Sequence, residues 1–100
     1  MNYSVLPHFV RVFDRYSQSE QLTINEALEG IKSYLENGRA PYRLRIKRLS
    51  AMIYEARISI RLRITFYRDK DTVKFFCLGN HEDISRCLKR LRFINLRASF

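Results

Sequence analysis

A strict alternation of apolar and polar side chains over residues 54–67 constrains this chain more than any other feature. Throughout this stretch the even positions are apolar or aromatic and the odd positions are polar, charged or able to face water. A period of two is that of an extended strand with one face in a core and the other face toward solvent. The predicted outer face holds Glu55, Arg57, Ser59, Arg61, Arg63, Thr65 and Tyr67.

One strand over residues 54–67 would exceed the usual strand length, so the pattern predicts a hairpin. A two-residue loop would place Ser59 opposite Leu62 and put a polar side chain on the apolar face. A three-residue loop over residues 60–62 pairs Ser59 with Arg63 and keeps both faces consistent. The alternation therefore favours the three-residue loop.

This loop length also decides how close two arginines of the outer face lie. Arg57 and Arg63 become diagonal neighbours across the hairpin, with Cβ atoms about 5–8 Å apart. Guanidinium groups at that distance repel each other unless an anion lies between them, and either Glu55 or a bound phosphate meets that need.

Positive charge is concentrated in the same part of the chain. The formal net charge is +9, and residues 39–68 carry many cations against the single carboxylate of Glu55. These cations are Arg39, Arg43, Arg45, Lys47, Arg48, Arg57, Arg61, Arg63 and Arg68. A patch of this kind favours a polyanionic partner, such as RNA, DNA or an acidic protein.

Two helices are predicted before the hairpin. A short strand over residues 2–6 leads into an amphipathic helix over residues 7–18, which begins with a proline. The second helix is expected to begin at a capping box of Thr23 and Glu26 and to end at Gly38.

Further strands and a last helix complete the predicted fold. Residues 44–47 alternate with a basic outer face, and residues 72–78 are apolar on both faces, which places them inside the sheet. A short helix begins near Asp83 or Ser85. Layer rules then predict one α+β domain over residues 1–100. Its N-terminal strand and helical hairpin pack on a mostly antiparallel, twisted sheet of four or five strands.

The cysteines, histidines and apolar runs bear on location and cofactors. Cys77 and Cys87 form no C-x-x-C motif, so the sequence predicts reduced thiols and a cytoplasmic protein. We expect neither a signal peptide nor a membrane span. The distant His8 and His81 do not supply the three or four converging ligands of a metal site, so no metal or cofactor is expected.

Four short motifs occur in the order typical of one known family. They are Lys47-Arg48-Leu49, Ile53-Tyr54-Glu55-Ala56-Arg57-Ile58, Leu62-Arg63-Ile64-Thr65-Phe66 and Cys77-Leu78-Gly79-Asn80-His81-Glu82-Asp83. With the length, the charge and the element order, they resemble the RelE/ParE superfamily of bacterial type II toxin–antitoxin toxins. The resemblance spans about residues 3–91 and is most specific over residues 53–83.

The resemblance implies a toxin that a co-expressed antitoxin holds inactive, with an acidic antitoxin segment covering the basic face of the hairpin. RelE-like members are metal-independent endoribonucleases that cut mRNA on the ribosome, whereas ParE-like members inhibit DNA gyrase. The segment 81–83 favours the RelE-like activity. Many RelE-like toxins place a catalytic tyrosine where this chain has Ser85-Arg86-Cys87. An inactive homologue that binds nucleic acid or an antitoxin therefore stays a third interpretation.

Each candidate residue then has an expected role. Arg57 and Arg63 form a phosphate clamp, because the guanidinium fork matches two phosphate oxygens. His81 transfers a proton, since its ordinary pKa of about 6.5 allows either direction at neutral pH. Glu55 acts as a base or holds Arg57, and Asp83 orients His81 or caps the last helix. The residues expected to bind mRNA or ribosomal RNA are Arg45, Lys47, Arg48 and Arg61.

Overall fold

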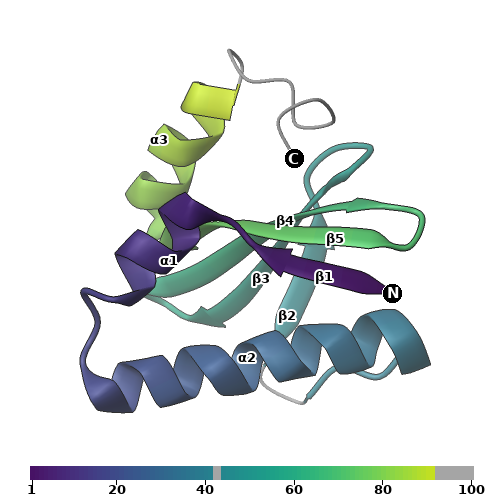
Figure 1. Cartoon of the computed structure of the whole chain (residues 1–100), viewed down its shortest axis with the longest axis horizontal. Helices are drawn as coiled ribbons and strands as arrows, with labels where there is room; N and C mark the ends of the chain where they lie inside the picture. Colours follow the sequence, from purple (N-terminus) through teal and green to yellow (C-terminus); the bar gives the residue numbers. More distant parts are fainter. Residues whose placement is uncertain (42–43, 92–100) are drawn as a thin grey trace.

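The fold is a five-stranded sheet with helices on both faces (Figure 1). The computed structural model describes residues 1–41 and 44–91, so Arg43 of the basic patch lies outside the described residues. The elements are β1 (Asn2–Val5), α1 (Pro7–Phe13), α2 (Gln18–Asn37), β2 (Arg45–Arg48), β3 (Ile53–Ser59), β4 (Leu62–Asp69), β5 (Thr72–Gly79) and α3 (His81–Leu91). The strand order is β1-β5-β4-β3-β2, with β1 parallel to β5 and the other neighbours antiparallel. The predicted α+β class and mostly antiparallel sheet are confirmed.

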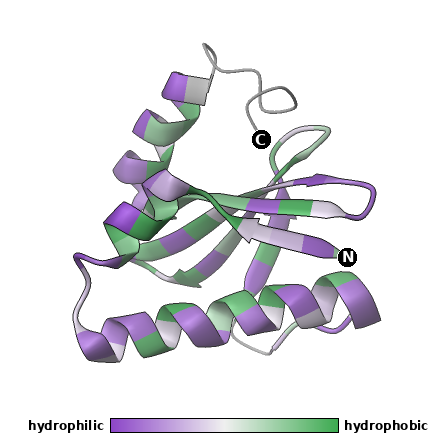
Figure 2. Cartoon of the chain, viewed as in Figure 1, coloured by the Kyte–Doolittle hydropathy of each residue, from purple (hydrophilic) through white to green (hydrophobic). Residues whose placement is uncertain are grey.

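Two apolar clusters lie on the two faces of the sheet. The larger cluster joins α1 and α2 to β3, β4 and β5, and its largest fully buried side chains are Phe9, Phe66 and Phe75. The smaller cluster lies beneath α3 and consists of Tyr67, Phe76, Cys77, Ile84 and Cys87. Figure 2 shows polar and apolar residues interspersed along α2, as expected for a helix with one buried face. Within residues 1–41 and 44–91, none of the helices combines the length and the apolar character needed to cross a bilayer.

The second helix begins earlier than the sequence predicted, and the first helix is correspondingly shorter. A capping box of Ser17 and Glu20 precedes it: the Glu20 N–H donates to Ser17 Oγ, and the Ser17 N–H donates to Glu20 Oε1. Thr23 lies inside the helix, where its hydroxyl donates to a backbone carbonyl one turn earlier. The sequence holds two Ser/Thr-x-x-Glu motifs, and the apolar periodicity favoured the second because the first turn of α2 is exposed and lacks apolar periodicity. The predicted helix end is confirmed, since Gly38 adopts a left-handed φ of 73°.

The hairpin between β3 and β4 has a two-residue turn at residues 60–61, so the predicted three-residue loop is wrong. Ser59 pairs with Leu62, and Arg57 pairs directly with Arg63. A bulge between Arg57 and Ser59 adds one residue to β3. Because of this extra residue, the apolar side chains of both strands still face the core. A two-residue turn is therefore compatible with the alternation.

Cys77 and Cys87 form a disulfide whose Cα atoms are 6.1 Å apart, so the prediction of reduced thiols is wrong. A register shift in the pairing of β4 with β5 puts Phe76 and Cys77 into the same cluster beneath α3. The disulfide therefore fixes α3 to the strand from which it emerges.

The face that carries the odd-numbered residues is less exposed than the alternation predicted. Glu55, Thr65 and Tyr67 are buried, and Arg57 and Arg63 are half-buried. The cause is α3, which contacts β4 and β5 on this face. Candidate residues of the hairpin consequently lie in a partly desolvated environment.

Candidate functional site

The register of the sheet aligns three arginines across three adjacent strands. Arg45 of β2 pairs with Arg57 of β3, and Arg57 pairs with Arg63 of β4. Arg63 pairs in turn with Gly79, where β5 leaves the sheet. Directly paired residues of an antiparallel sheet share a face, with Cβ atoms about 4.5–5.5 Å apart. We call Arg45, Arg57 and Arg63 the arginine row.

Glu55 lies in the next row of the same face and binds one member of the arginine row. Arg63 Nη1 donates to Glu55 Oε1 at 3.1 Å, and the two side chains are only 16% and 7% exposed. Glu55 thus holds Arg63, not Arg57. Removing one partner of such a buried pair leaves an uncompensated charge, so the pair fixes the Arg63 guanidinium in place.

The same Arg63 nitrogen contacts His81, the first residue of α3. Arg63 Nη1 lies 3.4 Å from His81 Nδ1. A guanidinium group donates hydrogen bonds and cannot accept them, so a hydrogen bond here would have Nδ1 as its acceptor. The exposed His81 ring therefore stands beside the Arg63 guanidinium group.

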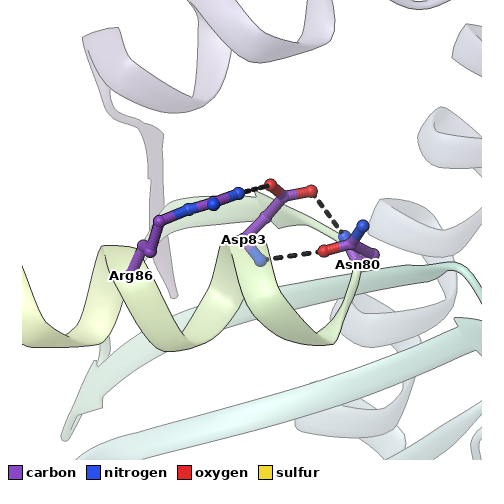
Figure 3. A network of polar contacts seen from close by, with 3 residues as sticks. All are labelled: Asn80, Asp83 and Arg86. Atoms are coloured by element: carbon purple, nitrogen blue, oxygen red, sulfur yellow. Dashed lines mark hydrogen bonds and ion pairs between the residues drawn. The ribbon is translucent and has the colours of Figure 1, made fainter.

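A reciprocal capping arrangement positions the start of α3 and with it His81 (Figure 3). The Asp83 N–H donates to Asn80 Oδ1 at 2.8 Å, and the Asn80 N–H donates to Asp83 Oδ2 at 2.9 Å. Arg86 Nη2 donates to Asp83 Oδ1 at 2.6 Å. The Asn80 N–H, and after it Arg86, hold the pKa of Asp83 below its ordinary value. Asp83 therefore supports the helix start, with Asn80 in the cap position, and its hydrogen bonds do not include His81.

Gly79 is required by this turn. Its φ of 150° suits glycine, and a Cβ atom there would lie 2.5 Å from Cβ and Oδ2 of Asp83. The capping carboxylate thus approaches the backbone of β5 at a distance that only glycine allows.

The residues predicted to bind RNA divide between the two faces and the turn. Arg45 and Lys47 are exposed on the face of the arginine row. Arg48 lies on the opposite face, where its guanidinium stands 5.9 Å from the Tyr54 ring centroid and donates to two carbonyls of the β2–β3 loop. Arg61 is exposed in the hairpin turn. The structure therefore groups Arg45 and Lys47 with the arginine row and separates Arg48 from it.

Sequence reasoning missed Thr65 and Asn80. Thr65 pairs with Glu55, and its hydroxyl is buried without a hydrogen-bond partner within the described residues, as is Arg63 Nε. A buried polar atom without a hydrogen-bond partner costs about 1–3 kcal/mol. The Asn-x-x-Asp spacing was a visible signal for Asn80, whereas nothing in the alternation marked Thr65. Among residues 1–41 and 44–91, no three His, Cys, Asp or Glu side chains converge as metal ligands.

Comparisons with known proteins identify the fold. A solved structure of the YoeB dimer from Staphylococcus aureus matches with a TM-score of 0.62 and 19% sequence identity, covering 81% of this chain and 97% of that chain. No protein-family model and no curated protein matches the chain. The shared architecture confirms the RelE-like fold that the motifs implied.

Proposed function

We propose that this protein is a ribosome-dependent mRNA endoribonuclease, the toxin of a type II toxin–antitoxin pair, acting without a metal or cofactor. The observation that carries the proposal is the meeting of the arginine row with a proton-transfer group: Arg63 Nη1 contacts both Glu55 and His81. The fold shared with YoeB, a RelE-family toxin, supports the assignment to a toxin.

The arginine row suits the phosphodiester backbone of RNA. Arg45 and Arg57 form no ion pair with a described residue, and both stand on the same face as Arg63. Arg57 and Arg63 bind the non-bridging oxygens of the scissile phosphate and stabilise the charge that grows there in the transition state. Arg45 and Lys47 hold the neighbouring backbone.

His81 is the proton acceptor in this proposal. A phosphate bound to Arg63 makes a charge-assisted hydrogen bond, which is stronger than the 3.4 Å contact between Arg63 Nη1 and His81 Nδ1. It displaces His81 Nδ1 from the guanidinium and frees that nitrogen to take the proton of the ribose 2′-hydroxyl. The 2′-oxygen then bonds to phosphorus, and the bond from phosphorus to the 5′-oxygen breaks.

Glu55 is a positioning residue and not the base, because it is buried and already accepts a hydrogen bond from Arg63. The departing 5′-oxygen needs a proton, and the chain has no tyrosine in or after α3 to supply one. We assign this proton to the ribosome–mRNA complex, which gives a physical reason for dependence on the ribosome.

Primer extension on a translated mRNA, with and without ribosomes, tests the proposal. Cuts should appear only with ribosomes and should be lost in His81→Ala but kept in the matched variant His8→Ala. Cleavage that needs no ribosomes, or that survives His81→Ala, would contradict the mechanism. An absence of cuts together with growth arrest and DNA damage would identify a gyrase inhibitor. An absence of both cuts and toxicity would identify an inactive homologue.

A further inference from the structure

A cleft of about 370 Å³ lies between α1 and α3, two helices that stand at the same end of the sheet (Figure 1). Its lining includes no member of the arginine row, and neither Glu55 nor His81. Its β5 residue, Leu78, packs into the larger cluster, whereas the arginine row faces the other side of the sheet. The cleft is thus a separate feature that the proposed cleavage reaction does not use.

The floor of this cleft is apolar. Leu78 and the disulfide-bonded Cys87 are buried, and Val12 is half-buried beside them. The half-buried Tyr16 forms one wall, and burial, followed by the charge of Asp83, raises the pKa of its hydroxyl. An apolar side chain of an incoming molecule would find a matching surface here.

The rim of the cleft is positively charged. Arg15, Arg86 and Arg90 are exposed around it, and Asp83 is the single carboxylate among its described lining residues. Asp83 is already bound by Arg86. Arg15 and Arg90 have no ion pair within the described part of the chain. The half-buried His8 completes the rim, and its pKa lies below the ordinary value because of burial and then of the charges of Arg90, Arg11 and Arg15.

We infer that this cleft is a docking site for an acidic segment of a partner protein. An apolar side chain of the segment fills the floor, and carboxylates on either side of it bind Arg15 and Arg90. Charge complementarity selects an acidic partner. The apolar floor selects a peptide over RNA, whose backbone needs a line of cations such as the arginine row. Identifying the partner as the antitoxin rests on the proposed function, whereas the site itself does not.

An NMR titration of the isotope-labelled full chain tests this inference with three probes. The probes are a blocked Glu-Leu-Glu peptide, a blocked Gln-Leu-Gln peptide and a short oligouridylate RNA. The acidic peptide should shift the amide signals of Val12, Tyr16 and Cys87 and raise the pKa of His8, because a nearby carboxylate favours the imidazolium form. The neutral peptide should bind at least tenfold more weakly.

Two double variants of equal charge separate the cleft from the general basicity of the chain. Arg15→Gln with Arg90→Gln should raise the dissociation constant of the acidic peptide at least tenfold. Lys70→Gln with Lys89→Gln removes two exposed cations outside the cleft and should change the dissociation constant less than twofold.

Several outcomes would overturn the inference. They are equal effects of the two double variants, equal binding of the two peptides, and shifts confined to the arginine row. Stronger occupation of the cleft by RNA than by the acidic peptide would assign the site to nucleic acid instead. The titration contains no ribosomes, so failure of the cleavage experiment and failure of this one are distinguishable.

Discussion

Removing the Arg63 side chain should destabilise this protein far more than removing Arg57, its neighbour in the arginine row. The alternation of the sequence predicts that the Arg63 side chain faces solvent, and removing a side chain from solvent would leave the fold intact. The structure shows instead a side chain that is 16% exposed and bound to a carboxylate that is 7% exposed. Arg63→Ala would leave Glu55 buried without its partner.

The size of the effect follows from this burial. Breaking a buried ion pair by deleting one member costs about 3–5 kcal/mol. The whole domain has a free energy of unfolding of roughly 5–15 kcal/mol, so the loss is a large fraction of it. At about 4–8 °C per kcal/mol, the melting temperature should fall by at least about 12 °C. Arg57→Ala, which breaks no ion pair with a residue of 1–41 or 44–91, should cost about 1 kcal/mol or less.

Urea unfolding of the purified variants measures these differences, and a double variant identifies their cause. Glu55→Leu with Arg63→Met replaces both charges by apolar groups and should lie within about 1.5 kcal/mol of the natural protein. Equal costs for Arg63→Ala and Arg57→Ala would refute the reasoning. A double variant as unstable as Arg63→Ala would show that packing, and not an uncompensated charge, is lost.

Three further predictions concern the anchoring of α3. Reduction of the Cys77–Cys87 disulfide by a dithiol should lower the free energy of unfolding by about 3 kcal/mol, given a sequence separation of 10, as a shift of the urea midpoint would show. Asp83→Asn should destabilise the protein at neutral pH, but this difference should shrink as the pH falls below about 4. Because folding lowers the pKa of Asp83, its carboxylate stabilises the fold fully only at a pH above the pKa of the unfolded chain. An unchanged stability difference between Asp83→Asn and the natural protein at pH 3 would contradict this. Gly79→Ala should lower the free energy of unfolding in urea by about 1–3 kcal/mol, because the new Cβ atom meets Asp83. It should also displace the NMR signals of His81. A variant as stable as the natural protein would argue against the described turn.

The fold class was predictable because the strands carry their own signals. The alternation over residues 54–67 and the apolar run of 72–78 identify β3, β4 and β5, and glycine marks the end of α2. The register was less predictable, since a bulge next to Ser59 changes which residues pair without changing the alternation. The start of α2 was missed because Ser17 and Thr23 open equivalent motifs, and only packing distinguishes them.

The candidate site was predictable as a set of residues but not as an arrangement. The sequence pointed to Arg57, Arg63, His81 and Glu55, and the structure brings the last three into contact through one guanidinium nitrogen. It could not show that Glu55 binds Arg63 and not Arg57, because that depends on the register. Nor could it show the burial of Thr65 or the disulfide, since both follow from α3 folding back over the sheet.

The rate of cleavage of ribosome-bound mRNA by the Glu55→Leu, Arg63→Met double variant tests the central claim most directly. This variant separates chemistry from folding, because the apolar pair replaces the buried charges. Removing one preorganised donor to the developing negative charge should slow single-turnover cleavage by about 100–1,000-fold. The matched variant Lys89→Met, an exposed cation outside the site, should cleave at the natural rate. A folded double variant that cleaves within a few-fold of the natural rate would contradict the role of Arg63 at the scissile phosphate.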